Sequence, residues 1–341
     1  GAPPDPERWS YVPLTAFYDD PDPQRALARH FDDLEQRPFL AGEEGVRLSL
    51  AGGQKKTALA VLAPDGTPVL RLPREGDALA VPLNGAPSTV ILKPDNPRLP
   101  GLTENETYCL HLATAIGIDT ARACILSAQD RAAICVLRYD RALTAAGGIR
   151  RVHQEDFAQA NGLPPGRKYE RGSLPGLTLA QLFATRHRLA QPIGDALLDQ
   201  VLFNVLVANT DAHAKNYSLL FPLNALPGLA PLYDVSTVLP WDGRGGGPRV
   251  VQTYAQKLAG KARRPGDLAP RHWERIAGDA GMRASVLRNR IVDMVDRMVA
   301  ARIATTGTVA QMQGAASGYV AEAAEALEGN ALRILGRLTA D

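Results

Sequence analysis

The sequence has little of what stabilises secreted, metal-bound or membrane-inserted proteins. Its 341 residues include three cysteines, Cys109, Cys124 and Cys135, each in an apolar context without a closely spaced partner. This spacing favours buried free thiols over disulfides or a zinc site. No segment approaches the roughly 18 consecutive apolar residues of a membrane helix, and the first thirty residues are proline-rich and acidic rather than signal-like. We therefore expect a soluble, cytoplasmic protein.

A strong net charge is also missing. The 38 Lys and Arg side chains nearly balance 36 Asp and Glu, and the resulting charge of +2 does not indicate a nucleic-acid-binding protein. A local excess lies in 255–275, which holds two acidic residues and six basic ones: Lys257, Lys261, Arg263, Arg264, Arg271 and Arg275. Either a solvated loop and helix face or a surface that binds phosphate or a partner explains this excess.

The hydrophobic pattern changes along the chain and separates a β-rich part from an α-rich part. After an N-terminal segment (1–45) with one short helix, residues 46–138 read as strands with glycine-containing turns and one inserted helix, Glu104–Ile116. From 139 to 341 the pattern is mostly helical and includes an apolar run over 192–209. The sequence thus predicts an α+β protein in which a β-rich lobe is joined to an α-rich lobe near Tyr139. This arrangement invites a test for the two-lobe, protein-kinase-like fold.

Kinase-like folds bind ATP between two such lobes, so the β-rich part should contain phosphate-binding groups. The glycine turn in Ser49–Lys56 has backbone amides that would approach phosphates, although such a turn alone is more typical of an ordinary hairpin. Lys93 ends the strand-like STVILK and would reach the nucleotide phosphates, although lysines at strand ends are usually solvated. Glu106 lies on the apolar face of the next helix and needs a partner such as Lys93. Glu104 competes for this role, and either glutamate would also serve as a helix cap.

The strongest local signal is the segment NTDAHAKN at 209–216. Asp211 and Asn216 have the D-x-x-x-x-N spacing with which kinases place a catalytic base beside a magnesium-binding amide. Asp234, in LAPLYDVST, follows as the candidate second magnesium ligand. A polar loop after a helix would explain the spacing alone. The four signals nevertheless occur in the order that a kinase requires.

Several sequence blocks resemble the HipA-like serine/threonine kinases, the toxins of bacterial type II toxin–antitoxin modules. They are RLSLAGGQKKTAL, TVILKP, NETYCLHLA, VLRYDR, QEDFAQ, KYE, NTDAHAKNYSLL, LAPLYDVST and NALRILGRL, and they run from about residue 47 to the C-terminus. The resemblance implies that Asp211 is the catalytic base and that Asn216 and Asp234 bind Mg²⁺. It further implies ATP contacts from a phosphate loop, a phosphate lysine, an adenine hinge and two later segments: Ala51, Gly52, Gly53, Gln54, Lys55, Lys56, Lys93, Leu137, Arg138, Tyr139, His213, Ala214, Lys215, Asn216, Tyr233 and Asp234.

The resemblance also implies regulation and partners. Ser49 matches the serine that such kinases autophosphorylate, and a phosphate there would repel ATP or displace the loop, which would switch the kinase off. The expected partners are a helix-turn-helix antitoxin (HipB-like) and a protein substrate such as an aminoacyl-tRNA synthetase. We expect DNA contact only through the antitoxin, because GDAG stands at 278–281 where some relatives carry basic residues.

The stretch before the phosphate loop departs from the family pattern. About 45 residues precede the loop, whereas full-length relatives carry a whole subdomain there. We therefore expect either a truncated chain or a compact, HipT-like kinase that receives this subdomain from a separate HipS-like protein.

Two other functions remain open from the sequence. The chain would serve as a kinase-fold corepressor if it mainly joined a DNA-binding antitoxin and contributed the basic stretch 255–275. It would be a small-molecule phosphotransferase if the same catalytic residues acted on a small alcohol. The favoured hypothesis is a Mg-ATP-dependent protein serine/threonine kinase that arrests growth and limits itself by autophosphorylation.

Overall fold

The chain folds into two compact units. The computed structural model describes residues 6–36, 55–170, 175–241, 243 and 250–339. The sheet unit comprises Gly1–Thr107, Ala121–Arg151 and Gln311–Ala316, and the helical unit comprises Tyr108–Thr120, Val152–Ala310 and Ser317–Asp341. The predicted domain limits after residues 45 and 138 stay a prediction.

The sheet unit is built on an antiparallel sheet that has seven strands among the described residues. Their order is β1 (Ser10–Pro13), β4 (Ala78–Leu83), β2 (Thr57–Leu62), β5 (Val90–Pro94), β7 (Arg131–Leu137) and β6 (Ala123–Ala128), with β3 (Pro68–Val69) paired to β2. The predicted turn at Asp65-Gly66 joins β2 to β3, with Gly66 at φ +83°, a conformation that glycine adopts without strain. A separate pair joins β8 (Arg141–Leu143) to β9 (Ile149–Arg151).

Helix α2 (Pro23–Gln36) covers one face of this sheet, after the short helix α1 (Leu14–Phe17). Apolar residues of α2 share a core with alternate residues of three central strands: Leu27, Phe31, Leu34, Leu59, Val61, Val90, Leu92 and Cys135. Ala60 and Leu62 of β2 belong to a second cluster. Successive side chains of a strand point to opposite faces, so β2 is buried on both.

The helical unit combines helices with a small sheet. Helix α3 (Leu102–Ala115) begins in the sheet unit and ends in this one. The remaining helices are α4 (Phe157–Ala160), α5 (Leu179–Ala184), α6 (Gly194–Leu206), α7 (Pro270–Asp279), α8 (Ala284–Ala310) and α9 (Ser317–Thr339). The three-stranded sheet has the order β10 (His153–Asp156), β11 (Ser218–Phe221) and β12 (Gly228–Leu229).

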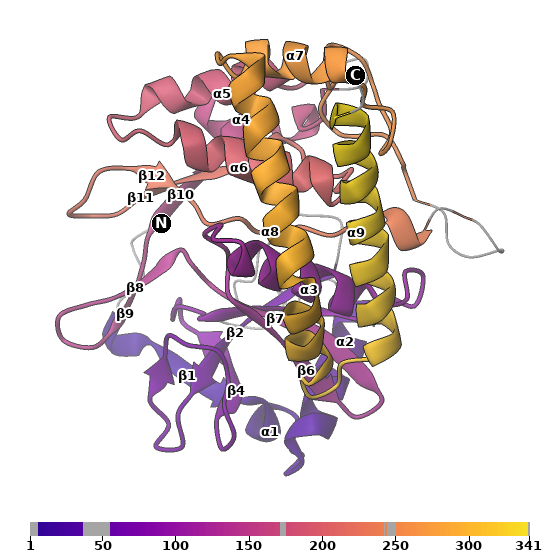
Figure 1. The fold of residues 1–341 in the computed structure, drawn as a ribbon. Helices are drawn as coiled ribbons and strands as arrows, with labels where there is room; N and C mark the ends of the chain where they lie inside the picture. The colour runs from indigo at the N-terminus through magenta and orange to yellow at the C-terminus, as the bar shows by residue number, and fades with distance from the viewer. Residues whose placement is uncertain (1–5, 37–54, 171–174, 242, 244–249, 340–341) are drawn as a thin grey trace. The chain divides into compact units, whose positions relative to one another are not determined.

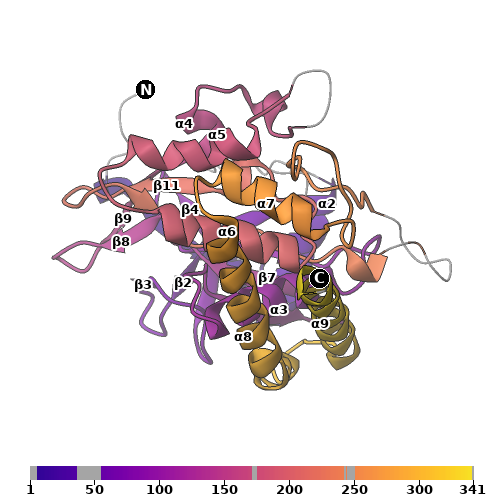
Figure 2. The same ribbon diagram turned by 45° about the horizontal axis from the view of Figure 1, so that its top comes forward.

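Helix α6 forms the buried centre of the helical unit. Most of its side chains from Leu197 to Leu206 are buried, including the polar Gln200 and Asn204. Figure 2 shows α5 on one side of α6 and the helices α8 and α9 on the other. Figure 1 shows α8 and α9 side by side as a long helical hairpin. Because α6 is covered on all these sides, the loop that follows it starts from a fixed position.

The α+β class and most predicted elements are present. Helices predicted at Glu104–Ile116 and within 192–209 correspond to α3 and α6, and the helical tail consists of α7, α8 and α9. The sequence did not predict five strands of the described residues: β1, β4, β8, β9 and β10. No helix in the described ranges combines the length and apolar character needed to cross a membrane.

Candidate functional site

In the sheet unit, Lys93 and Glu106 form a buried ion pair. Lys93 Nζ donates to Glu106 Oε1 at 2.6 Å, and the two residues are 6% and 3% exposed. Glu104 instead accepts the backbone N–H of Ala316 at 3.0 Å. The structure thereby resolves the choice between the two glutamates in favour of Glu106, whereas the role of Lys93 toward phosphates stays a prediction.

Two other predicted ATP-binding groups of this unit are placed only in part. In the phosphate loop, Ser49 and Ala51–Gln54 lie outside the described residues, Lys55 is exposed and Lys56 is half-buried. In the hinge, the backbone N–H groups of Leu137 and Arg138 donate to Arg122 and Thr89 carbonyls, at 2.8 and 2.9 Å. The Arg138 guanidinium forms a bidentate pair with Asp140 at 2.9 and 2.6 Å, and Tyr139 is half-buried.

In the helical unit, two buried asparagines hold the loop that carries Asp211. The chain leaves α6 through Ala208, whose φ of +56° lies in the left-handed region that few non-glycine residues adopt. Asn209 then bonds back to Asn204 twice, through its backbone N–H at 2.8 Å and its Nδ2 at 2.7 Å. The Asn209 side-chain oxygen accepts the N–H of Asp211 at 3.3 Å. These bonds fix the backbone on which the catalytic-base candidate stands.

Asp211 itself is exposed, and its carboxylate accepts a hydrogen bond from a distant segment of the chain. The Tyr169 hydroxyl donates to Asp211 Oδ1 at 2.7 Å, across 42 positions of sequence. The carboxylate therefore lies at the surface of the helical unit with one oxygen engaged. A base that must meet an incoming hydroxyl requires this kind of exposure.

The two predicted magnesium ligands meet in the structure. Asn216 Nδ2 donates to Asp234 Oδ2 at 3.1 Å although the residues are 18 positions apart. The Asn216 Oδ1 accepts the His213 backbone N–H at 3.2 Å, so the same short segment links Asn216 to Asp211. Asp234 has φ +55°, a left-handed conformation that aspartate tolerates better than most residues. The spacing D-x-x-x-x-N and the later aspartate thus converge in one place.

The other predicted nucleotide contacts of this unit bond within the protein. Lys215 forms an ion pair with Asp156, which is also the N-cap of α4. The Tyr233 hydroxyl donates to the Lys215 carbonyl at 2.7 Å, and the buried Ala214 donates its N–H to the Lys168 carbonyl at 3.3 Å. These contacts hold the loop between Asp211 and Asn216 against β10, Lys168 and Tyr233.

His213 is buried beside this loop. Burial lowers the pKa of its imidazole, because the charged form would lose hydration. No described residue lies in hydrogen-bonding geometry to its buried Nδ1. A buried ring nitrogen without such a bond is costly and fits a polar ligand group or a water.

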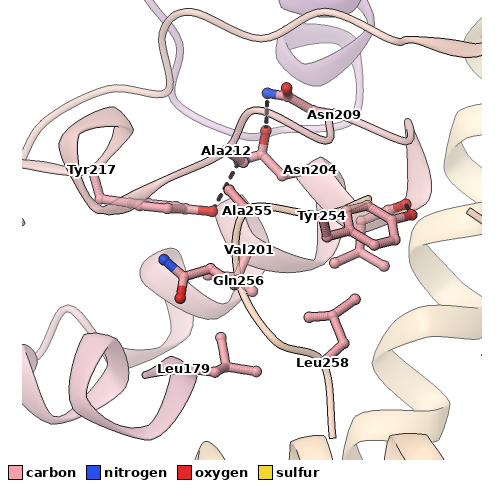
Figure 3. Close-up of a pocket in the computed structure, with 11 residues that line it drawn as sticks. Leu179, Val201, Asn204, Asn209, Ala212, Tyr217, Tyr254, Ala255, Gln256 and Leu258 are labelled. Carbon is pink, nitrogen blue, oxygen red and sulfur yellow. Dashed lines mark hydrogen bonds between the residues drawn. The ribbon is translucent and has the colours of Figure 1, made fainter. Parts of the chain in front are cut away.

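A small pocket of about 20 Å³ lies behind the loop, between α6 and the 254–258 segment (Figure 3). Asn204 and Tyr217, which are hydrogen-bonded to each other at 3.2 Å, line it together with the apolar Leu179 and Leu258. Gln256 also lines it, and the described residues offer no partner to either polar atom of its buried side chain. About 20 Å³ is enough for a water molecule, so this pocket is too small for a nucleotide.

Sequence reasoning missed the residues that hold the site together. Asn204, Asn209 and Asp156 hold the loop, and Tyr169 contacts Asp211 directly. Glu170 holds the neighbouring Lys257 backbone. The signal for Tyr169 was the block KYE, which was recognised without a role. The signal for Asn204 was an amide inside an otherwise apolar run.

Comparison with known proteins places these features in context. Residues 48–302 match the family model described as HipA-like C-terminal domain. A Sinorhizobium fredii protein named "Putative kinase Y4mE" is 39% identical over 83% of this chain and 63% of its own length. The serine/threonine-protein kinase toxin HipA of Shewanella oneidensis is 29% identical over 62% of this chain and 48% of its own length. The chain thus spans between about half and 63% of the length of these relatives.

Solved structures show the same fold. HipA in the Shewanella oneidensis complex of HipA, HipB and operator DNA superimposes with a TM-score of 0.75 at 22% identity, over 99% of this chain and 74% of that one. The Helicobacter pylori proinflammatory kinase CtkA gives a TM-score of 0.55 at 11% identity, over 86% and 94%. At these identities the likeness establishes the kinase-like α+β fold.

Proposed function

The chain belongs to the family of HipA-like C-terminal domains, and from this premise we propose that it is a Mg-ATP-dependent protein serine/threonine kinase. The observation that carries the proposal is the contact of Asn216 with Asp234 at 3.1 Å, on the same short loop as the exposed Asp211. A base candidate and two oxygen-bearing metal-ligand candidates are parts that protein kinases use in phosphoryl transfer.

The residues present fit magnesium and a nucleotide. Mg²⁺ takes carboxylate and amide oxygens and is usually bound by one or two carboxylates together with substrate phosphates, and Asp234 with Asn216 supplies such a set. The buried Nδ1 of His213 offers a further polar group beside them. ATP would supply the transferred phosphoryl group and Mg²⁺ would neutralise charge on its phosphates. In this proposal Lys93, held by Glu106, binds the phosphates, and Asp211 accepts the proton of the acceptor hydroxyl.

The experiment that tests this function incubates the purified protein with Mg-ATP labelled in the γ-phosphate, alone and with cell extract. We expect label on the protein itself or on an extract protein. Replacement Asp211→Ala should lower transfer by roughly 10²- to 10⁴-fold, the usual contribution of a general base. Asp130→Ala, at an exposed turn of the sheet unit, is the matched control and should be active. The proposal is refuted if the wild type transfers no label to itself or to any extract protein, or if Asp211→Ala transfers as much label as the wild type.

Autophosphorylation at Ser49 is part of the same proposal. Ser49 stands in the sequence block RLSLAGGQKKTAL, directly before the candidate phosphate loop, where a phosphate would repel the phosphates of ATP. Mass spectrometry of the tryptic peptide that contains Ser49 should find the phosphate. Ser49→Ala should stay active during incubation with ATP while the wild type loses activity, and equal loss in both contradicts self-inactivation.

We further propose a toxin role with a HipB-like antitoxin as the partner, because the solved complex of the Shewanella oneidensis HipA contains HipB and operator DNA. A second function, as corepressor, is favoured by the exposure of Lys261, Arg264 and Arg271 in the basic stretch 255–275. Titration of operator DNA with the antitoxin, with and without this chain and at several salt concentrations, distinguishes the two. A steeper salt slope in the presence of the chain would indicate additional phosphate contacts.

A further inference from the structure

Tyr169 is a residue of the site to which the proposed function assigns no role. Its hydroxyl donates to Asp211 Oδ1 at 2.7 Å. Resting on the proposed kinase function, we propose that Tyr169 is a positioning residue that sets the orientation of the Asp211 carboxylate. Tyr169 occupies Oδ1, and Oδ2 is thereby presented to the acceptor hydroxyl whose proton it takes.

The backbone around Tyr169 is fixed from its own segment. The Gly176 N–H donates to the Tyr169 carbonyl at 2.7 Å, and the Arg167 guanidinium donates to the Pro175 carbonyl at 3.0 and 2.7 Å. A Cβ on Gly176 would lie 2.3 Å from the Arg167 carbonyl oxygen, so only glycine permits this approach. Residues 167–169 and 175–176 are thus tied together independently of Asp211.

The neighbours of Tyr169 dock the segment on the rest of the helical unit. Lys168 accepts the Ala214 N–H at 3.3 Å. Glu170 donates its N–H to the Ala255 carbonyl at 3.2 Å, and its buried carboxylate accepts the Lys257 N–H at 2.7 Å. Glu170 is 6% exposed, and this burial raises the pKa of its carboxyl. Tyr169 therefore enters the site from a segment anchored on both sides.

The ring of Tyr169 is oriented by two further contacts. It meets His213 edge to face, with ring centroids 5.1 Å apart and an interplanar angle of 73°, and the Lys168 ammonium lies 4.8 Å from the ring centroid. Both geometries are favourable for an aromatic ring. Because the ring is held without the help of Asp211, the position of the hydroxyl is set in advance. The exposed carboxylate adapts to the tyrosine rather than the reverse.

These contacts argue for positioning rather than for a blocking role. A carboxylate has two oxygens and about four acceptor sites, and Tyr169 uses one oxygen. If Tyr169 had to leave before each reaction, its ring would have to give up its contacts with His213 and Lys168, because the bonds to Gly176, Ala214 and Lys257 fix the backbone from which the side chain extends. A contact so firmly anchored is suited to remain in place during turnover and to hold a charged group steady.

Tyr169→Phe tests the inference, because it removes only the hydroxyl and keeps the ring against His213. Hydrogen bonds to charged groups are worth enough that kcat for autophosphorylation or substrate transfer should fall by roughly 10- to 100-fold. KM for ATP and the melting temperature should stay near wild type. Tyr319→Phe, at an exposed tyrosine of α9, is the matched control and should leave kcat unchanged.

A second comparison separates positioning from a merely structural role. In the Asp211→Ala background, Tyr169→Phe should cause no further loss of the residual rate, because Tyr169 acts through the missing carboxylate. An unchanged kcat in Tyr169→Phe, or the same factor of loss in both backgrounds, overturns the inference while the kinase function stands. A wild type without transfer activity overturns the proposed function and this inference with it.

Discussion

The buried pair Lys93–Glu106 permits a prediction with a defined magnitude. Both side chains are almost fully buried and are joined at 2.6 Å. Glu106→Gln keeps the shape of the side chain and removes its charge, so a buried ammonium loses the carboxylate that compensates it. Breaking a buried pair in this way costs roughly 3–5 kcal/mol. Typical proteins have unfolding free energies of about 5–15 kcal/mol, so the loss should be conspicuous.

The double replacement Lys93→Met with Glu106→Leu should cost less stability than Glu106→Gln alone. It removes both charges together and leaves two apolar side chains of similar volume between β5 and α3. Replacing a whole buried pair with apolar groups is often close to neutral. The exposed pair Arg297–Asp293 on α8 provides the control, with side chains 43% and 64% exposed. Asp293→Asn should cost below about 1 kcal/mol, as surface pairs do.

Urea unfolding of the four proteins, compared at an unchanged m-value, measures these differences. Nucleotide binding is measured on the same samples. The double variant should be folded yet bind ATP weakly, because the proposed phosphate lysine is gone. A Glu106→Gln protein within about 1 kcal/mol of wild type would refute the reasoning. A double variant that costs as much stability as Glu106→Gln would do the same.

Two further predictions concern His30 and Asp234. Burial lowers the pKa of His30 to about 4 in the folded protein, whereas in the unfolded chain it is about 6.5. Between these two pH values the unfolded chain therefore binds a proton that the folded protein does not bind, which favours unfolding. The free energy of unfolding should fall by roughly 3 kcal/mol between pH 6.5 and 4. His30→Gln should flatten this pH dependence, whereas His153→Gln, at an exposed histidine, should keep it. Parallel curves of stability against pH for wild type and His30→Gln would contradict the prediction. Asp234→Asn should retain the left-handed backbone at φ +55°, whereas Asp234→Ala should cost about 1 kcal/mol more stability. Both variants should weaken Mg-dependent nucleotide binding. Equal melting temperatures of the two variants would exclude the argument from backbone strain.

Elements whose pattern lies within a short stretch could be predicted, and those stabilised by distant pairing could not. Helix α6 was evident from its apolar run, and β5 from the β-branched residues before Lys93. Strand β4 contains Pro82, which argues against a strand in the middle of a sheet. In the structure Pro82 pairs with Tyr11 of β1. The pairing of β4 with β2 ends before Pro82, at Ala80. A proline is tolerated there because β2 does not need its N–H, which the sequence alone does not reveal.

The same distinction applies to the site. Asp211 and Asn216 are fixed by a short spacing, and Asp234 follows β11 and β12, whose antiparallel pairing returns the chain toward Asn216. Their proximity therefore follows from local structure. The contact of Tyr169 with Asp211 spans 42 positions and depends on how the 167–176 segment docks on the loop. Its position cannot be inferred from any periodicity.

The polar groups around the loop differ in burial, and this difference matches their different roles. Asn204, Asn209 and Asn216 are 3–4% exposed and are hydrogen-bonded, whereas Asp211 is exposed. A neutral amide is buried at little cost once its bonds are made, but a carboxylate is buried only at the expense of its hydration. The amides can therefore fix the backbone from inside, while the charged group stays where an acceptor hydroxyl can reach it. What the amides cannot fix is the rotation of an exposed side chain, and this is the degree of freedom that the Tyr169 hydroxyl removes.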